Sequence, residues 1–167
     1  GLRRIWLEPT STPQYYPLVH TLFWLEYQIW GLEPLGYHLV NVVFHGISAF
    51  VLWRVLLRLD VPGAWLAAAV FALHPVHVES VAWITERKNV LSGFFYLWAA
   101  WAYLRFLPIN GSGTVGFRTN SVRYYRLTWL AFIAALLSKT VTASLPVALL
   151  LITWWKRRSI QWRDVVY

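Results

Sequence analysis

The residues of this sequence that could do chemistry are concentrated in two short polar stretches. The longer stretch runs from residue 74 to residue 89, and the shorter one is Ser138-Lys139-Thr140. Together they hold three cations, Arg87, Lys88 and Lys139. Guanidinium and ammonium groups bind phosphate or pyrophosphate through charge-assisted hydrogen bonds, so these residues predict a phosphate site. The alternative is that the cations pair with nearby carboxylates or reach lipid headgroups.

Two carboxylates, Glu79 and Glu86, lie in the longer stretch. They are seven residues apart, which is two helical turns, so in a continuous helix they share one face. Two carboxyl groups on one face could assist a reaction as general acid and base. The alternative is that these carboxylates pair structurally with Arg87 or Lys139.

His74, His77 and Glu79 offer the imidazole and carboxylate groups that zinc and manganese bind. Pro75 stands between the histidines, however, and their spacing matches no established metal motif. In the alternative interpretation, Pro75 ends a helix and the polar side chains bond to nearby backbone and to each other. We therefore predict no metal ligands and no cofactor.

A polar stripe also lies in the apolar run that precedes the longer stretch. His38 and His45 are seven residues apart with Asn41 between them, so all three share one helical face. A stripe of this kind typically mediates helix packing, and the alternative is a proton pathway.

The composition indicates where these polar residues lie. Of the 167 residues, 58% are hydrophobic and 13% are charged, against roughly 25% charged residues in a soluble domain. The apolar content excludes a disordered chain, and the absence of cysteine excludes a disulfide scaffold. So few charges also argue against a soluble enzyme.

Apolar runs recur along the chain and predict an all-α, multipass transmembrane bundle of about five spans. The runs cover residues 37–59, 64–73, 90–106, 124–137 and 140–155. The second, fourth and fifth are shorter than the roughly 20 residues that cross a bilayer. The polar residues that end them are therefore expected at membrane depth, where they are tolerated around a water-filled or ligand-filled cavity.

The charges predict an orientation. With residues 1–35 outside and five spans, the outer segments hold five cations, Arg3, Arg4, Arg87, Lys88 and Lys139. The inner segments hold ten, namely Arg54, Arg58, Arg105, Arg118, Arg123, Arg126, Lys156, Arg157, Arg158 and Arg163. This agrees with the positive-inside rule, so the net charge of +8 reflects topology rather than nucleic-acid binding.

Residues 1–35 are expected to form part of the first outer loop, and residues 36–167 the transmembrane region. Within the loop, residues 18–30 predict an amphipathic helix with Leu18, Leu22, Leu25 and Ile29 on its apolar stripe and Glu26 off it. This helix is too short and polar to span, so we expect it on the outer membrane surface. Residues 110–121 predict an inner connector.

Three sequence motifs resemble one known family. They are GYHLVN at residues 36–41, FALHPVHVE at residues 71–79, and LLSK at residues 136–139 followed by Leu145-Pro146. Together they resemble the membrane portion of the transmembrane and tetratricopeptide-repeat O-mannosyltransferase-like proteins, in their bacterial form. That family belongs to the GT-C class of membrane glycosyltransferases.

The resemblance implies transfer of a sugar, mannose in this family, from a polyprenyl-phosphate carrier to protein hydroxyls. It implies a site facing the periplasm in the inner membrane of a bacterium. The site for the carrier phosphate and the sugar would be lined by His74, His77, Glu79, Arg87, Lys88 and Lys139. Beside them, Tyr16, Pro17 and Leu18 would shape the outer loop.

In related GT-C enzymes the catalytic carboxylate lies early in the first outer loop. The chain is therefore expected to begin after that residue and to lack the catalytic base, with Glu79 and Glu86 left as assisting carboxylates. The GT-C module is accordingly expected to be incomplete at both ends. Expected partners are the lipid bilayer, the lipid-linked sugar and a protein acceptor. Two other interpretations are a transporter or flippase for a lipid-linked sugar and a non-catalytic membrane anchor for a repeat domain.

Overall fold

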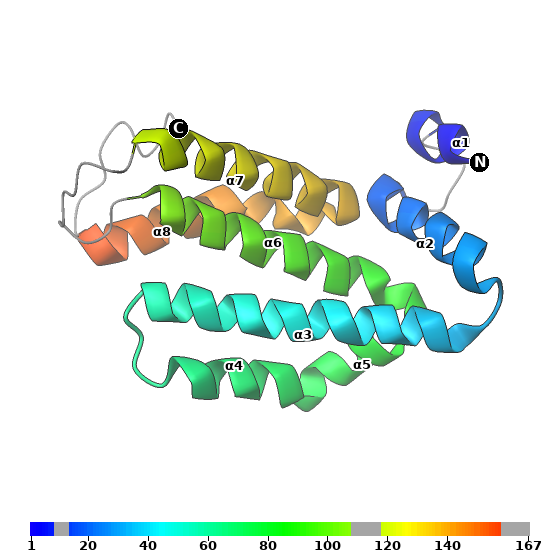
Figure 1. Ribbon diagram of the computed structural model, residues 1–167, viewed down its shortest axis with the longest axis horizontal. Coiled ribbons are helices and arrows are strands. Elements are labelled where there is room, and N and C mark those ends of the chain that lie inside the picture. The colour runs from blue at the N-terminus through cyan, green and yellow to red at the C-terminus, as the bar shows by residue number, and fades with distance from the viewer. Residues whose placement is uncertain (9–13, 108–117, 158–167) are drawn as a thin grey trace.

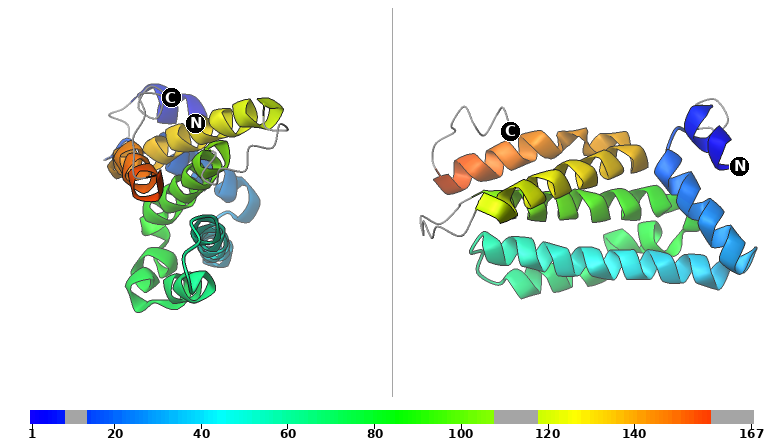
Figure 2. Two further views of the ribbon diagram at one scale, coloured as in Figure 1. Left: turned by 90° about the vertical axis from the view of Figure 1, so that its left-hand side faces the viewer. Right: turned by 45° about the horizontal axis from the view of Figure 1, so that its top comes forward.

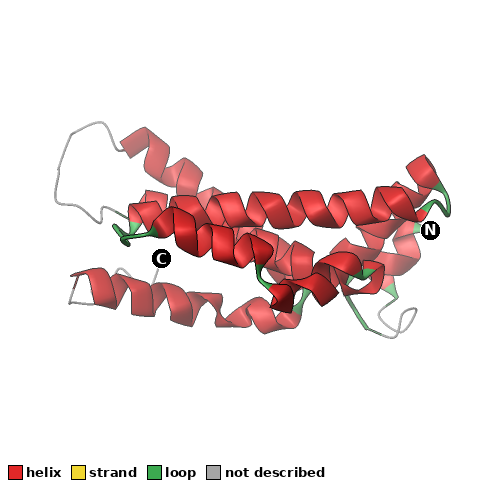
Figure 3. Ribbon diagram, turned by 90° about the horizontal axis from the view of Figure 1, so that it is seen from below, coloured by secondary structure: helices red, strands yellow, loops and turns green. Residues whose placement is uncertain are grey.

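The computed structural model describes residues 1–8, 14–107 and 118–157, and this part of the chain is helical without strands (Figure 3). The prediction of an all-α fold is confirmed. The predicted connector lies mostly outside the described residues, as do Arg158 and Arg163. The helices are α1 (Leu2–Leu7), α2 (Pro17–Trp30), α3 (Pro34–Arg58), α4 (Ala64–Leu73), η2 (Pro75–His77), α5 (Val78–Ala82), η3 (Ile84–Glu86), α6 (Arg87–Phe106), α7 (Arg118–Ser138), η4 (Thr140–Ser144) and α8 (Leu145–Arg157).

The long helices run alternately in opposite directions. Figure 1 shows that the direction reverses from each element to the next in the order α3, the α4–α5 segment, α6, α7 and α8. One end of the bundle carries α2, η3 and η4, and we call it the α2 end; the α3–α4 turn lies at the opposite end. Seen end-on, α6 lies between the α3–α4 pair and the α7–α8 pair (Figure 2). The helix order places both polar stretches of the sequence at the α2 end.

Proline and glycine set several of these boundaries. Pro34 and Pro75 occupy first-turn positions of α3 and η2, where the missing N–H costs nothing. The residue before Pro75 is extended, with ψ 130°, because the proline ring disfavours helical backbone there. Gly63 has φ +73° in the turn that reverses the chain between α3 and α4, a conformation that glycine adopts without strain.

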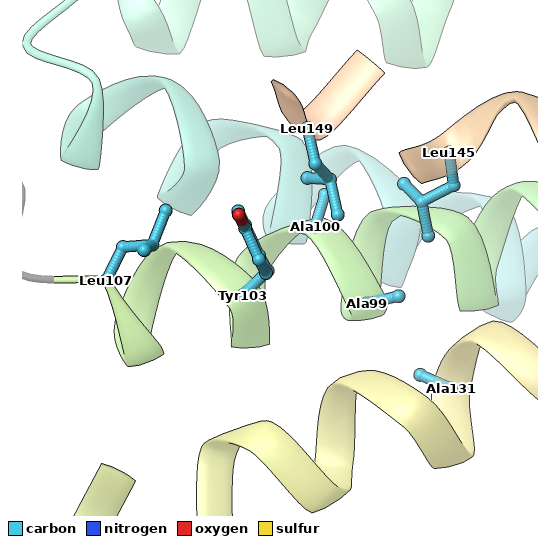
Figure 4. Close-up of a cluster of buried hydrophobic side chains, with 7 residues drawn as sticks. All are labelled: Ala99, Ala100, Tyr103, Leu107, Ala131, Leu145 and Leu149. Carbon is cyan, nitrogen blue, oxygen red and sulfur yellow. The ribbon is translucent and has the colours of Figure 1, made fainter. Parts of the chain in front are cut away.

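The core contains a close contact between α6 and α7 through small side chains. Ala99 of α6 and Ala131 of α7 are 0% and 6% exposed, and Leu145 and Leu149 of α8 pack in the same cluster (Figure 4). Alanine at these positions lets the helix backbones approach closely, as in helix pairs within membranes.

Replacing Ala99 with leucine is expected to lower the free energy of unfolding by about 1–3 kcal/mol, because the added carbons have no space between the helices. A denaturant titration in detergent, followed by helical circular dichroism, measures the change. Ala67→Leu is the matched control because Ala67 is exposed on α4. Equal stability of the two variants would show that the α6–α7 contact is not close-packed.

Helix α3 is long and apolar enough to cross a membrane. Only 28% of its most apolar 18-residue window is buried within the protein, whereas the core helix of a soluble protein buries most of its apolar residues. The α4 helix with residues 75–82 meets the same criterion as a pair bent by 46°. Large apolar side chains are exposed on several helices, including Leu39, Phe50, Trp65, Leu130 and Leu151. An exposed apolar surface of this extent is typical of contact with lipid.

Helix α2 buries its carboxylate and exposes part of its apolar stripe, an arrangement that the sequence pattern did not specify. In α2, Leu25 and Ile29 are 46% and 70% exposed, whereas Glu26 is 2% exposed. The C-terminal half of the apolar stripe faces away from the bundle, whereas Leu18 and Leu22 are half-buried. The charged residue faces into the bundle, where α2 packs against α3, α6 and α7. Sequence amphipathicity cannot tell lipid from protein as the neighbour of the apolar stripe.

Candidate functional site

A network of polar side chains joins the two polar stretches at the α2 end. Lys139 Nζ donates to Asn89 Oδ1. Asn89 Nδ2 in turn donates to Glu86 Oε2 at 2.6 Å and contacts Ser80 Oγ at 3.3 Å. Lys88 Nζ lies 3.4 Å from the other carboxylate oxygen of Glu86. We call these five residues the lysine cluster.

The break after α7 positions Lys139. The α7 helix ends at Ser138, and Lys139 is extended, with φ −165° and ψ 128°, before the chain turns into η4. The Lys139 carbonyl accepts a 2.7 Å hydrogen bond from Thr142 Oγ1, so the turn satisfies the backbone at the break. This break directs the Lys139 side chain toward α6 instead of continuing the helix.

The N-terminus of α6 holds the other half of the cluster. Glu86, Lys88 and Asn89 lie in or next to its first turn, where the helix dipole favours a negative charge. The side chains of Lys88 and Glu86 are 26% and 23% exposed, so a ligand can reach them from outside. Two lysines and one carboxylate leave the cluster with a surplus of positive charge.

Arg87 does not belong to the lysine cluster. Its side chain is 0% exposed and forms an ion pair with Glu26 of α2. Its second terminal nitrogen donates to the Tyr37 carbonyl at 2.7 Å, and the guanidinium lies 5.1 Å from the centre of the Phe23 ring. Burial raises the pKa of the Glu26 carboxyl, and the hydrogen bond and charge of Arg87 oppose that shift. In this structure Arg87 therefore joins α2, α3 and α6, and its predicted phosphate contact would require this pair to open.

Asn41 holds the break between α5 and η3 against α3. Its side chain is fully buried, and Nδ2 donates to the carbonyls of Val81 at 3.1 Å and Trp83 at 3.3 Å. Carbonyls freed by a helix break need such a partner in an apolar surrounding. Asn41 therefore has the helix-packing role that was predicted for the polar stripe of His38, Asn41 and His45.

The histidines line a separate pocket of about 270 Å³ between α3 and the α4–α5 segment. His38 and His45 line it from α3, and His74 and His77 line it from η2 and its N-terminal flank. His45 Nε2 lies 3.2 Å from the Ala72 carbonyl, and its ring centre is 5.2 Å from that of His77. No group of three potential metal ligands with suitable geometry occurs among the described residues.

Helix α5 separates this pocket from the lysine cluster. Val78, Val81 and Ala82 line the histidine pocket, whereas Ser80 contacts Asn89. The structure thus brings Lys88, Lys139 and Glu86 together and places His74 and His77 elsewhere.

The two carboxylates do not share a continuous helix. The chain is extended at Trp83, with ψ 121°, so α5 ends before η3 begins, and the continuous helix that would put both carboxylates on one face does not form. Glu86 is held by Lys88 and Asn89. Glu79 is exposed and makes no hydrogen bond or ion pair with another side chain in the described part of the protein.

The three residues predicted to shape the outer loop lie where α2 begins. Tyr16 caps the helix, Pro17 is its first residue and is buried, and Leu18 follows it half-buried. Pro17 also accepts a 2.7 Å hydrogen bond from Thr21 Oγ1 through its carbonyl. They therefore fix the start of the helix that carries Glu26.

Sequence reasoning missed Asn89 and Glu26. Asn89 lies between the two cations Arg87 and Lys88 and the apolar run that begins at residue 90. A polar side chain at the start of an apolar run was the signal that could have identified it as a site residue. Glu26 had a weaker signal, since one carboxylate in a short amphipathic helix is usually solvated.

Comparison with known proteins identifies relatives of this chain. The chain is 37% identical over 99 residues to the mouse protein O-mannosyl-transferase TMTC3, which covers 59% of this chain and 11% of that protein. It is 30% identical over 152 residues to the Drosophila melanogaster protein O-mannosyl-transferase Tmtc3, covering 77% of this chain and 16% of that protein. The chain belongs with the TMTC protein O-mannosyl-transferases.

The predicted resemblance is thereby confirmed at the level of the family. A TMTC2 relative from Xenopus laevis is 36% identical over 103 residues, or 60% of this chain and 12% of that protein. The chain thus spans about a tenth to a sixth of the length of these TMTC relatives. No protein-family model and no solved structure matches it.

Proposed function

We propose that this chain is part of a membrane-embedded glycosyltransferase that transfers mannose from a polyprenyl-phosphate carrier to protein hydroxyls. The proposal takes its reaction from the relatives, which are named protein O-mannosyl-transferases. The polyprenyl-phosphate donor comes from the family resemblance, and the cations at the α2 end support a phosphate carrier. The side of the membrane rests on the distribution of charge along the bundle.

The observation that carries the proposal is the lysine cluster. Lys139 and Lys88 come from breaks 51 residues apart in the sequence and meet around Glu86 and Asn89. When a sugar leaves a phosphate carrier, negative charge develops on the departing phosphate. Cations that are already in place stabilise this charge without reorganising at the moment of reaction.

We assign different roles to the residues of this end. Lys139 and Lys88 contact the carrier phosphate, and Glu86 and Asn89 position them. Glu79 is the exposed carboxylate that assists the acceptor hydroxyl. His74 and His77 line their own pocket, so we propose for them a contact with the sugar or carrier away from the phosphate.

We further propose that the bundle spans the membrane with about five passes and with the α2 end outside, which is the periplasm in a bacterium. The exposed apolar side chains of α3, α4, α7 and α8 support lipid contact. Charge supports the orientation, because Arg54, Arg58 and Arg105 lie at the opposite end. The exposed apolar stripe of α2 fits the outer membrane surface.

Cysteine labelling tests this orientation, and these 167 residues contain no cysteine that would react in the background. We expect Leu32→Cys, at an 88% exposed position of the α2 end, to react with a membrane-impermeant maleimide in intact cells. Pro62→Cys, in the α3–α4 turn, should react only after the membrane is opened. The reverse pattern would invert the orientation, and labelling of both would exclude a spanning bundle.

The transfer itself is tested with the full-length protein purified in detergent. Polyprenyl-phosphate mannose and an acceptor peptide rich in serine and threonine are supplied, and mass spectrometry detects the glycopeptide. Glycopeptide that depends on Lys139 supports the proposal. Movement of the donor across the vesicle membrane without formation of glycopeptide would instead identify a flippase. If the protein showed neither activity, the remaining interpretation would be a membrane anchor.

A further inference from the structure

A second cationic site lies at the end of the bundle opposite α2. A cavity of about 250 Å³ is lined by Arg54, Leu57 and Arg58 of α3 and by Trp101 and Arg105 of α6. This volume is below the roughly 300–1,000 Å³ of pockets for drug-sized ligands, so it suits a small anionic group.

Two of the three guanidinium groups are held in place. Arg58 Nε donates to the Leu104 carbonyl at 2.6 Å, and the Arg105 guanidinium lies over the Trp101 ring, 5.2 Å from its centre. The Nε of Arg105 is buried without a hydrogen-bond partner in the part of the protein that the structure describes. Arginine side chains from two different helices thus line one cavity.

Within the described residues, the only carboxylate with a resolved electrostatic effect on these arginines is Asp60, which acts on Arg58 without forming an ion pair with it. None of the ion pairs there involves Arg54, Arg58 or Arg105. Asp60, the described carboxylate at this end, lies 3.5 Å from Lys156. Arg54 and Arg58 are also four residues apart on one helix, a spacing at which like charges repel. A bound anion would remove this repulsion and accept several charge-assisted hydrogen bonds.

We infer that this cavity binds the phosphate of an anionic lipid headgroup. The lipid source follows from position, because α3 is long and apolar enough to span a membrane and ends at Arg58. Arginines at the end of a span lie at headgroup depth, where anionic lipids concentrate. Leu57 and Trp101 give the cavity an apolar wall for the start of the acyl chains of the lipid. The site lies at the other end of the bundle from the lysine cluster, and its test does not depend on the proposed transfer.

Native mass spectrometry of the full-length protein in neutral detergent tests this inference. The probes are dihexanoyl-phosphatidylglycerol, dihexanoyl-phosphatidylcholine and inorganic phosphate. We expect saturable binding of phosphatidylglycerol and at least tenfold weaker binding of the other two. Arg54→Gln and Arg105→Gln should each weaken phosphatidylglycerol binding about tenfold, since each removes a charged hydrogen-bond donor.

Arg123→Gln is the matched control, because Arg123 is exposed on α7 and does not line the cavity. Arg54 is itself exposed, so its substitution removes no buried contact and keeps the test valid if Arg105→Gln fails to fold. Equal binding of the two lipids, or an unchanged affinity of Arg54→Gln, would overturn the inference. Binding of inorganic phosphate in place of phosphatidylglycerol would overturn the lipid assignment.

Discussion

Replacing Arg87 with leucine is expected to destabilise the folded protein by about 3–5 kcal/mol, since removal of one partner leaves a buried charge uncompensated. Glu26 would remain with its side chain 3% exposed and with its cationic partner gone. The Tyr37 carbonyl would also lose its 2.7 Å hydrogen bond. Because the pair joins α2 to α6, we expect α2 to detach before the rest of the bundle unfolds.

Denaturant titration in detergent, read by helical circular dichroism, measures the loss. The double variant Glu26→Leu with Arg87→Leu should recover part of it, because no charge is then left buried. The control is Glu8→Gln, which breaks the exposed pair of Arg4 and Glu8 and should cost little. A loss in Arg87→Leu as small as that in Glu8→Gln would show that the buried pair does not hold α2.

The pH dependence of the Arg87→Leu variant provides a second measurement. Burial raises the pKa of Glu26 from its ordinary value of 4.5, and the hydrogen bond and charge of Arg87, which oppose that shift, are absent from the variant. A carboxyl whose pKa is raised on folding favours the folded state when protonated. The variant should therefore be most stable below pH 4.5 and lose stability as the pH rises through the raised pKa.

Replacing Lys139 with alanine is expected to reduce kcat for mannosyl transfer by about 10²–10³-fold in the full-length protein, the loss seen when one group that stabilises developing charge is removed. This expectation rests on the proposed function. Lys139→Arg keeps the charge and should retain more activity than Lys139→Ala. It should not reach the full rate, because the break between α7 and η4 sets the position of the charge for a lysine side chain. Lys88→Ala should cost less, because Glu86 already neutralises much of the Lys88 charge.

Initial rates of glycopeptide formation at saturating donor measure the effect. Lys156→Ala is the matched control, because it removes a lysine at the opposite end of the bundle, where Lys156 pairs with Asp60. Equal rates for the Lys139 and Lys156 variants would remove the lysine cluster from the reaction. Circular dichroism of each variant separates this outcome from loss of folding.

The helices and their breaks were accessible from the sequence because the forces that set them are local. The apolar run at residues 37–59 corresponds to α3, Pro34–Arg58, and the helix begins three residues before the run. Pro75 ended α4, and Ser138-Lys139 ended α7, as the interrupted apolar pattern predicted. Periodicity and proline act over a few residues, so a sequence pattern records them directly. The placing of the polar stretches at one end then followed from alternating helix direction.

The tertiary structure decided which of those polar residues meet. Arg87 and Lys88 are adjacent in the sequence, yet successive helical residues point about 100° apart, so one enters the core and the other the lysine cluster. The partner of Arg87 is Glu26, 61 residues earlier in the chain. The histidines were expected beside the lysines, and α5 separates them. Such pairings depend on how helices distant in sequence pack together, and no local pattern of residues carries that information.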